Sequence, residues 1–175
     1  LADFLTDSPF NLAKMVVGSE GTLATVVAAK LQVIPLPVAK VLGIVQFEGL
    51  VESMRAVAPI LETEPAAIEL IDSMILEQTT GSMELSKMRS WVQGDPEAVL
   101  AVEYYGDSSE DLVKKLDALE TLLGVLNLQY VFSRAIPEGD QADVWNVRKA
   151  GLGLLMGVKG DSKPVAFVED AAVPP

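Results

Sequence analysis

Two consecutive segments of the sequence share one order of predicted elements: a strand, a helix and a second strand. The first segment has strand-like runs at 40–47 and 66–71 on either side of a helical run at 49–62. The second has strand-like runs at 98–105 and 128–135 with another helical run between them. Each helical run has one apolar face to bury, so the pattern restricts the chain to layers of helices packed on strands. The two segments are similar in length but not similar enough in sequence to form a repeat.

The apolar face of each helical run is visible in the spacing of its residues. In the first run the face is Leu50, Met54, Val57 and Leu61, and in the second it is Leu112, Leu116, Leu119 and Leu123. A further long helix is expected through Met156, with a final strand at 165–168. We therefore expect an α+β fold, a ferredoxin-like βαβ-βαβ antiparallel sheet with helices on one face.

Two helix starts carry capping residues. Asp72 is suited to cap a short helix that follows the strand-like run at 66–71. Ser108, with Asp111 three residues later, resembles a capping box in which Asp replaces the usual Glu or Gln. Between these helices, the polar and glycine-containing residues 79–95 predict an excursion with some helix around Trp91.

The residues before the first strand predict a separate, smaller piece of structure. A short helix ends near Val17, and a β-prone run at 22–34 then stops at Pro35-Leu36-Pro37. Proline lacks the donor that a sheet ladder needs and stiffens the chain, so we expect a linker there. The predicted domains are therefore 1–37, a helix and a strand, and 38–175.

The composition excludes several classes of protein. Half of the 175 residues are hydrophobic and mean hydropathy is +0.33, which favours a filled core over a disordered tail. Charges, prolines or glycines interrupt every apolar run before the roughly 20 residues that a membrane helix needs, so no membrane span is expected. The net charge of −12 disfavours nucleic acid or an anionic membrane surface as the main partner.

Two residue types with wide chemical use are missing from the sequence. With no cysteine, the chain has no disulfide, no thiolate nucleophile and no cysteine ligand for a metal. With no histidine, it lacks the commonest general base near neutral pH and the commonest metal ligand. We therefore expect no metal site and little catalytic chemistry from this chain alone.

The strongest local motif is the Gly-Ser-Glu-Gly-Thr-Leu sequence at 18–23, between the short helix and the β-prone run. Two glycines three residues apart allow a tight turn and close approach of the backbone to a ligand. Free amides and the Ser19 and Thr22 hydroxyls could then bind a cofactor. An ordinary Gly-Ser turn is the alternative, and the GK[ST] ending of a phosphate-binding P-loop is absent.

A second candidate is Arg148, within the Val-Trp-Asn-Val-Arg-Lys sequence of the long predicted helix. It lies four residues after Val144 and four before Leu152, so a helix places it beside apolar neighbours. A guanidinium stays charged, so partial burial requires an anion or several acceptors. An internal Asp or Glu meets this requirement, and so does a substrate carboxylate held by two hydrogen bonds. The residue pattern leaves both open.

The order of the motifs resembles one flavoprotein family. Residues 11–24, followed by a run ending at Leu36-Pro37, are similar to the close of the FAD-binding domain in vanillyl-alcohol-oxidase-like flavoproteins. The Trp145-to-Arg148 spacing and the Asp170-to-Pro174 ending are similar to the substrate domain of the FAD-linked oxidase branch. That branch includes glycolate, D-lactate and D-2-hydroxyglutarate dehydrogenases, which pass a hydride from a 2-hydroxyacid to the flavin.

The resemblance implies a role for each part of the chain. Residues 1–37 would be the edge of the FAD-binding domain, and 38–175 most of a truncated C-terminal substrate domain. The residues expected against FAD are Gly18, Ser19, Glu20, Gly21 and Thr22. Arg148 would hold the substrate carboxylate with help from Lys163. No catalytic base is assigned in this chain, so we expect an internal fragment that is inactive by itself.

The resemblance also has departures and an alternative. The family's pyrophosphate loops would lie before Leu1, and its His-rich metal and proton-transfer cluster after Pro175. The ending from Lys163 onward is most similar to large members fused to an iron–sulfur region, and Ala24 replaces a usual glycine. A cytoplasmic location, or one peripheral to the inner face of a membrane, is expected, with the electron acceptor unassigned. The alternative function is a non-catalytic ferredoxin-like module that binds small molecules or assembles homo-oligomers.

Overall fold

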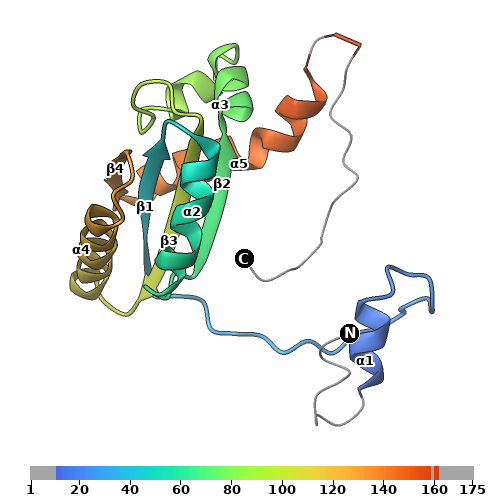
Figure 1. Ribbon diagram of the computed structural model, residues 1–175. Helices are drawn as coiled ribbons and strands as arrows, with labels where there is room; N and C mark the ends of the chain where they lie inside the picture. Colours follow the sequence, from blue (N-terminus) through green and yellow to red (C-terminus); the bar gives the residue numbers. More distant parts are fainter. Residues whose placement is uncertain (1–10, 159, 162–175) are drawn as a thin grey trace. The chain divides into compact units, whose positions relative to one another are not determined.

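The computed structural model describes residues 11–158 and 160–161, and the chain divides into two compact units (Figure 1). The first unit is Leu1–Leu36 and the second is Pro37–Pro175. The assignment of 1–37 and 38–175 to an FAD-binding and a substrate domain stays a prediction.

The first unit contains the predicted short helix, α1 (Leu12–Val17), which begins at Asn11. The Asn11 side chain caps the helix by accepting a hydrogen bond from a first-turn amide at 2.9 Å. The expected strand at 22–34 is wrong, because residues 24–37 have no regular secondary structure and no described strand pairs with them. β-Branched residues favour a strand only where a neighbour completes the ladder. Their side chains are exposed instead, and that of Val27 is 94% accessible.

The second unit is built on a four-stranded antiparallel sheet in the order β2-β3-β1-β4. Its strands are β1 (Ala39–Phe47), β2 (Ala67–Asp72), β3 (Ala98–Gly106) and β4 (Tyr130–Ala135). The central pair aligns Leu42 with Glu103, and β2 aligns Glu69 with Ala101. The predicted α+β fold with alternating strands and helices is confirmed, and β2 and β4 are its edges.

One face of the sheet is covered by α2 (Leu50–Leu61) and α4 (Ser109–Val125), the two helices predicted from their apolar faces. The core on this side includes Val41, Val45, Phe47, Leu100, Val102 and Tyr104 from the strands, and Ile60, Leu112, Leu116, Leu119 and Leu123 from the helices. All of these side chains are at most 2% exposed, so this face is fully removed from water.

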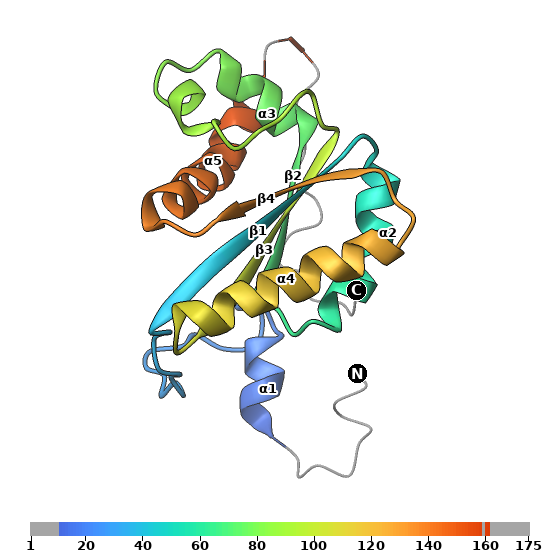
Figure 2. The ribbon, with the colours of Figure 1, turned by 90° about the vertical axis from the view of Figure 1, so that its left-hand side faces the viewer.

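Helices also cover the opposite face of the sheet, whereas the sequence predicted helices on one face. These are α3 (Ser73–Thr80), the 3₁₀ helix η2 (Leu85–Met88) and α5 (Glu138–Met156). Figure 2 shows the sheet between the α2–α4 pair and the α3–α5 pair. The physical reason lies in the central strands, where seven consecutive residues of each are buried. A strand that is apolar on both faces must be covered on both.

α5 is fastened to the sheet by a buried amide and by close packing. The Gln141 side chain donates to the Lys40 carbonyl at 2.9 Å and to the Ile136 carbonyl at 2.7 Å. One turn before the helix ends, a Cβ added at Gly151 would lie 3.0 Å from Ile75 of α3. Anchors near both ends therefore fix the part of α5 that carries the candidate arginine.

Both predicted helix caps are confirmed. The Asp72 carboxylate accepts from the Ile75 amide at 2.9 Å, and the Ser108 hydroxyl accepts from the Asp111 amide at 3.2 Å. The strand expected at 165–168 lies outside the described residues. Among the helices of the described part of the chain, none is long and apolar enough to cross a membrane.

Candidate functional site

Arg148 lies on α5 beside the edge strand β2. The preceding turn of the helix holds Val144 and Val147 at 0% exposure against the sheet. The Arg148 Nε donates a hydrogen bond of 2.8 Å to Oε2 of Glu69 on β2. The two side chains are 42% and 38% exposed, so the pair is formed at the border between core and solvent.

The Glu69 contact occupies only one part of the guanidinium. Among the described residues no other group accepts a hydrogen bond from Arg148, so its Nη1 and Nη2 donors are unused. Arginine binds a planar anion best through two parallel donors, and the two terminal nitrogens form such a pair. The sequence allowed either an internal carboxylate or a substrate carboxylate as the partner of Arg148. The internal carboxylate is present as Glu69, and it leaves Nη1 and Nη2 in a geometry that can bind a substrate carboxylate.

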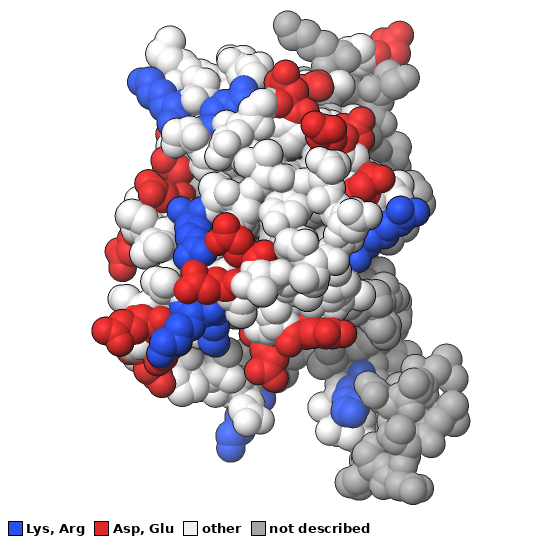
Figure 3. Space-filling view, turned by 60° about the vertical axis from the view of Figure 1, so that its left-hand side comes forward, with Lys and Arg blue, Asp and Glu red and all other residues white. Residues whose placement is uncertain are grey.

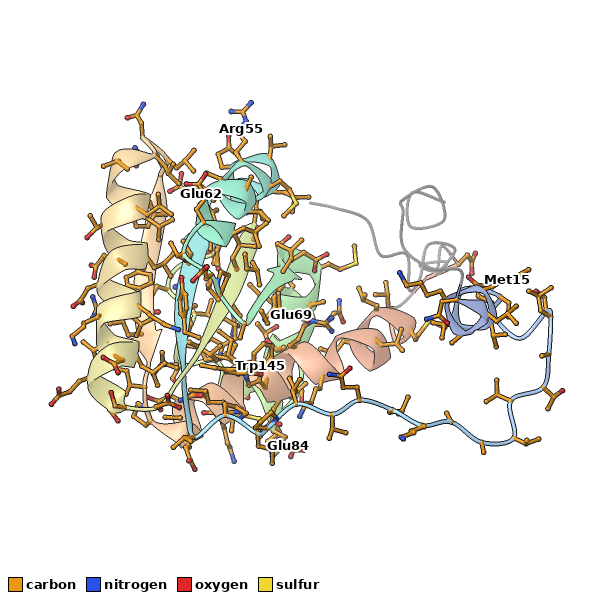
Figure 4. All side chains as sticks on the ribbon, turned by 90° about the horizontal axis from the view of Figure 1, so that it is seen from below. Met15, Arg55, Glu62, Glu69, Glu84 and Trp145 are labelled. Carbon is orange, nitrogen blue, oxygen red and sulfur yellow. The ribbon has the colours of Figure 1, made fainter. Side chains whose placement is uncertain are left out.

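Trp145 packs against the buried cluster on the same side of the sheet as Arg148. Glu69 and Trp145 are labelled in Figure 4, which views the unit from below.

A second ion pair lies on the same face of the sheet as Glu69. Lys40 Nζ is 3.9 Å from Oε1 of Glu103, whose side chain is 8% exposed. A hydrogen bond with Glu103, together with its negative charge, raises the pKa of the Tyr105 hydroxyl above its usual value.

The cation of β4 contrasts with Arg148. Arg134 contacts Glu120 and lies 2.7 Å from Asp117, both on α4. The hydrogen bonds to Glu120 and then Asp117 raise the pKa of Arg134. Figure 3 shows acidic and basic side chains interleaved on the face in view. Both terminal nitrogens of Arg134 bind protein carboxylates, whereas within the described part of the chain neither terminal nitrogen of Arg148 does.

In the first unit, the sequence at 18–22 forms a tight turn after α1. The Thr22 amide donates to the Ser19 carbonyl at 2.9 Å, and Glu20 and Gly21 between them have φ of 49° and 77°. Both central residues are thus left-handed, a conformation that glycine adopts without strain. The Ser19 hydroxyl donates to the Val16 carbonyl at 2.7 Å and the Thr22 hydroxyl to the Ser19 carbonyl at 2.6 Å.

The turn has the features that a cofactor contact needs. Neither the Glu20 nor the Gly21 amide donates a hydrogen bond to any described residue. A Cβ added at Gly21 would meet nothing within 4 Å, so the backbone is open on that side. Free amides and an uncovered glycine fit hydrogen bonding to the polar edge of a cofactor such as FAD. The predicted donor hydroxyls are already used within the turn, so they could serve a ligand only as acceptors.

The predicted site residues fall in different parts of the chain. The turn at 18–22 belongs to the first unit and Arg148 to the second. Lys163 lies outside the described residues. Within the described ranges no group of three or more acidic side chains is arranged to hold a metal.

Glu69 is the residue that sequence reasoning missed. Its neighbours Ile68 and Leu70 pack on the α2–α4 side, so strand alternation turns Glu69 toward α5. In the sequence, Glu69 is the one acidic residue of the apolar strand predicted at 66–71. Its partner, 79 positions away, could not be read from the sequence.

Two pockets elsewhere in the second unit contain none of the predicted site residues. One has a volume of about 380 Å³ and is lined by Gln46, Gln93 and Tyr130 among others. The other has a volume of about 410 Å³ and lies beside Glu52, Arg55 and Asn127. The first is lined by the end of β1, the start of β4 and nearby loop residues, and the second by loop residues and the first turns of α2.

Comparison with known proteins gives a consistent result. Residues 36–175 match the family described as FAD linked oxidases, C-terminal domain. The chain is 32% identical over 172 residues to D-2-hydroxyglutarate dehydrogenase of Pseudomonas putida, with 95% of the chain covered. It is 27% identical over 179 residues to the protein of that name from Escherichia coli, and 24% identical over 163 to D-lactate dehydrogenase of Anaerostipes hadrus. The chain spans 17% of the length of each of the first two relatives and 33% of the third.

Proposed function

The chain belongs to the family of FAD linked oxidases, C-terminal domain, and on that premise we propose that it is a segment of an FAD-dependent dehydrogenase that oxidises a D-2-hydroxyacid. The substrate class follows the relatives, which are named for D-2-hydroxyglutarate and D-lactate. Both of these compounds carry a carboxylate next to the hydroxyl-bearing carbon. The segment supplies most of the substrate domain (38–175) and the edge of the FAD-binding domain (1–37).

The observation that carries the proposal is the half-used guanidinium of Arg148. Its Nε is engaged by Glu69, while Nη1 and Nη2 have no partner among the described residues and lie at the border of the core. A 2-hydroxyacid carboxylate accepts from these two nitrogens in parallel, which fixes both the position and the rotation of the reacting carbon. The resemblance assigns Lys163 as a second cation for the same carboxylate.

The first unit would contribute to the cofactor site. The free amides of Glu20 and Gly21, within the turn Gly18–Thr22, would donate to polar atoms of FAD. Bound FAD supplies the acceptor for the hydride that leaves the hydroxyacid. The chain has no histidine, and no base is assigned to it for the hydroxyl proton, so the segment alone is expected to be inactive.

The test uses the full-length protein that contains this chain, purified and kept free of oxygen. Its visible absorbance is recorded while D-2-hydroxyglutarate, D-lactate or glycolate is added, with the L-enantiomers of the first two as matched controls. A yellow protein bleached by a D-hydroxyacid and not by its L-enantiomer supports the proposal. A protein that stays colourless after reconstitution with FAD would refute it and favour the non-catalytic binding module.

A further inference from the structure

Glu69 and Arg148 are held on separate, independently anchored elements. Glu69 is on the edge strand β2, whose ladder with β3 aligns it with Ala101. Arg148 is on α5, which Gln141 and the packing of Gly151 against Ile75 attach to the sheet. Because other contacts fix both backbones, the two side chains are held within hydrogen-bonding distance, at 2.8 Å.

A bond at Nε fixes the orientation of the guanidinium. The group is planar and its donors point in set directions, so one directed bond at Nε defines where Nη1 and Nη2 point. An arginine with a free rotation would lose that freedom when it binds a carboxylate, whereas one already held loses less. Glu69 thus prepares the terminal nitrogens to receive an anion.

The charge of Glu69 acts in the opposite direction from its geometry. A carboxylate beside Arg148 cancels part of the positive charge and weakens the attraction for an anionic substrate. If Glu69 influenced binding only through charge, removing it would tighten anion binding. If it acts by orientation, removing its acceptor oxygen weakens binding. The two effects have opposite signs, so one measurement separates them.

From this arrangement we infer that Glu69 is a positioning residue, which orients Arg148 through Nε so that Nη1 and Nη2 are presented to the substrate carboxylate. The inference rests on the proposed function, because it requires Arg148 to bind that carboxylate. It adds Glu69 of β2 to the proposed carboxylate site on α5. The role of Glu69 depends on its acceptor oxygen and not on its negative charge.

The variants Glu69→Ala, Glu69→Gln and Arg148→Ala test the inference in the full-length protein with FAD bound. Glutamine keeps an acceptor oxygen for Nε and loses the charge, whereas alanine loses both. Glu77→Ala is the matched control, since Glu77 is an exposed carboxylate on α3 that forms no ion pair with any residue the structure describes. Both members of the Glu69–Arg148 pair are more than a third exposed, so their bond adds little stability and all variants should fold.

The readouts are the dissociation constant of oxalate, measured by calorimetry, and kcat and KM for the hydroxyacid that bleaches the flavin. Oxalate presents carboxylates but has no hydrogen to transfer, so its binding is independent of turnover. Glu69→Ala should raise the oxalate dissociation constant and KM by about tenfold, equivalent to about 1.4 kcal/mol, with kcat changed less. Glu69→Gln should restore most of the affinity, and Glu77→Ala should match the unchanged protein.

Three results would overturn the inference. Unchanged or tighter oxalate binding in Glu69→Ala would show that orientation is not the role of Glu69. Equal weakening in the alanine and glutamine variants would show that the acceptor oxygen is not what matters. Oxalate binding that survives Arg148→Ala would remove the carboxylate role of Arg148 itself, and the positioning role with it. The last result is recognisable because it appears in Arg148→Ala and not in the Glu69 variants alone.

Discussion

Gly43 of β1 lies directly against Leu119 of α4: a Cβ at residue 43 would be 2.6 Å from the Leu119 Cδ2 atom and 3.1 Å from Phe132. Leu119 is fully buried, so α4 can approach the sheet this closely only because position 43 has no side chain. The contact sets the distance between the sheet and the helix that covers it.

Replacing Gly43 by valine should therefore destabilise the second unit. Overpacking a filled core costs about 1–3 kcal/mol, because neighbours must leave their preferred rotamers. Urea unfolding followed by tryptophan fluorescence measures this, with Gly153→Ala as the control. A Cβ at Gly153 meets nothing within 4 Å, and in the interior of α5 it should stabilise by about 0.8–1 kcal/mol. Equal midpoints for both variants would contradict the account.

Gln46 connects β1 to the loop after η2, and its loss should loosen that loop. The side chain, 2% exposed, donates to the Trp91 carbonyl at 3.3 Å and accepts from the Gln93 amide at 2.9 Å. Gln46→Leu leaves both backbone groups without a partner, which should cost about 1–3 kcal/mol. Urea unfolding checks the value against Gln129→Leu, since the exposed Gln129 side chain has no hydrogen bond to a described residue. If Gln46→Leu were as stable as Gln129→Leu, water would be replacing the hydrogen bonds of the Gln46 amide at no cost in free energy.

The N-terminal cap of α4 should make stability depend on pH. Hydrogen bonds from Ser108 and then Lys114 hold the pKa of Asp111 below its usual value. Because the folded pKa is depressed, this stabilisation is present above the unfolded pKa near 4 and is lost as pH falls through the folded pKa. Ser108→Ala should raise the pKa of Asp111 toward its usual value and, through the lost cap, cost about 1 kcal/mol.

The measurement for this cap is an NMR titration of the Asp111 carboxyl combined with thermal unfolding. Ser109→Ala, one residue later, is the matched control because the Ser109 side chain makes no hydrogen bond within residues 11–158 and 160–161. An Asp111 pKa that is the same in both variants would show that Ser108 does not bond the carboxylate in solution.

The turn after α1 should distinguish its two glycines by flavin content. Gly21 has φ of 77°, whereas Gly18 has φ of −80° and an open environment that tolerates a Cβ. In the full-length protein, Gly21→Val should strain the turn, move the free amides and lower the ratio of flavin to protein after gel filtration. Gly18→Ala should retain the flavin. An equal ratio of flavin to protein in the two variants would show that the turn does not hold the cofactor.

The pattern of apolar residues was sufficient for the sheet and its first two helices, because periodicity reports which face of an element is buried. The helices on the second face were readable in the same way from the mostly apolar runs of β1 and β3, which need cover on both sides. The strand predicted at 22–34 was wrong because a strand depends on a neighbouring strand, and the local sequence does not contain that partner. For Arg148, sequence predicted the need for an anion, but its partner Glu69 is set by the pairing of β2 and the angle of α5.

The claim at the centre of this account is that Arg148 recognises a carboxylate. Its most direct test compares the full-length enzyme and Arg148→Ala on the hydroxyacid that reduces the flavin and on the amide of that acid, which lacks the charge. We expect Arg148→Ala to keep its flavin and to lower kcat/KM for the acid by about a hundredfold or more. That factor corresponds to the loss of about 3 kcal/mol from a charged, hydrogen-bonded pair. For the amide, kcat/KM should change little. Equal losses for the acid and the amide, or no loss for either, would contradict the assignment of Arg148 as the carboxylate-binding residue.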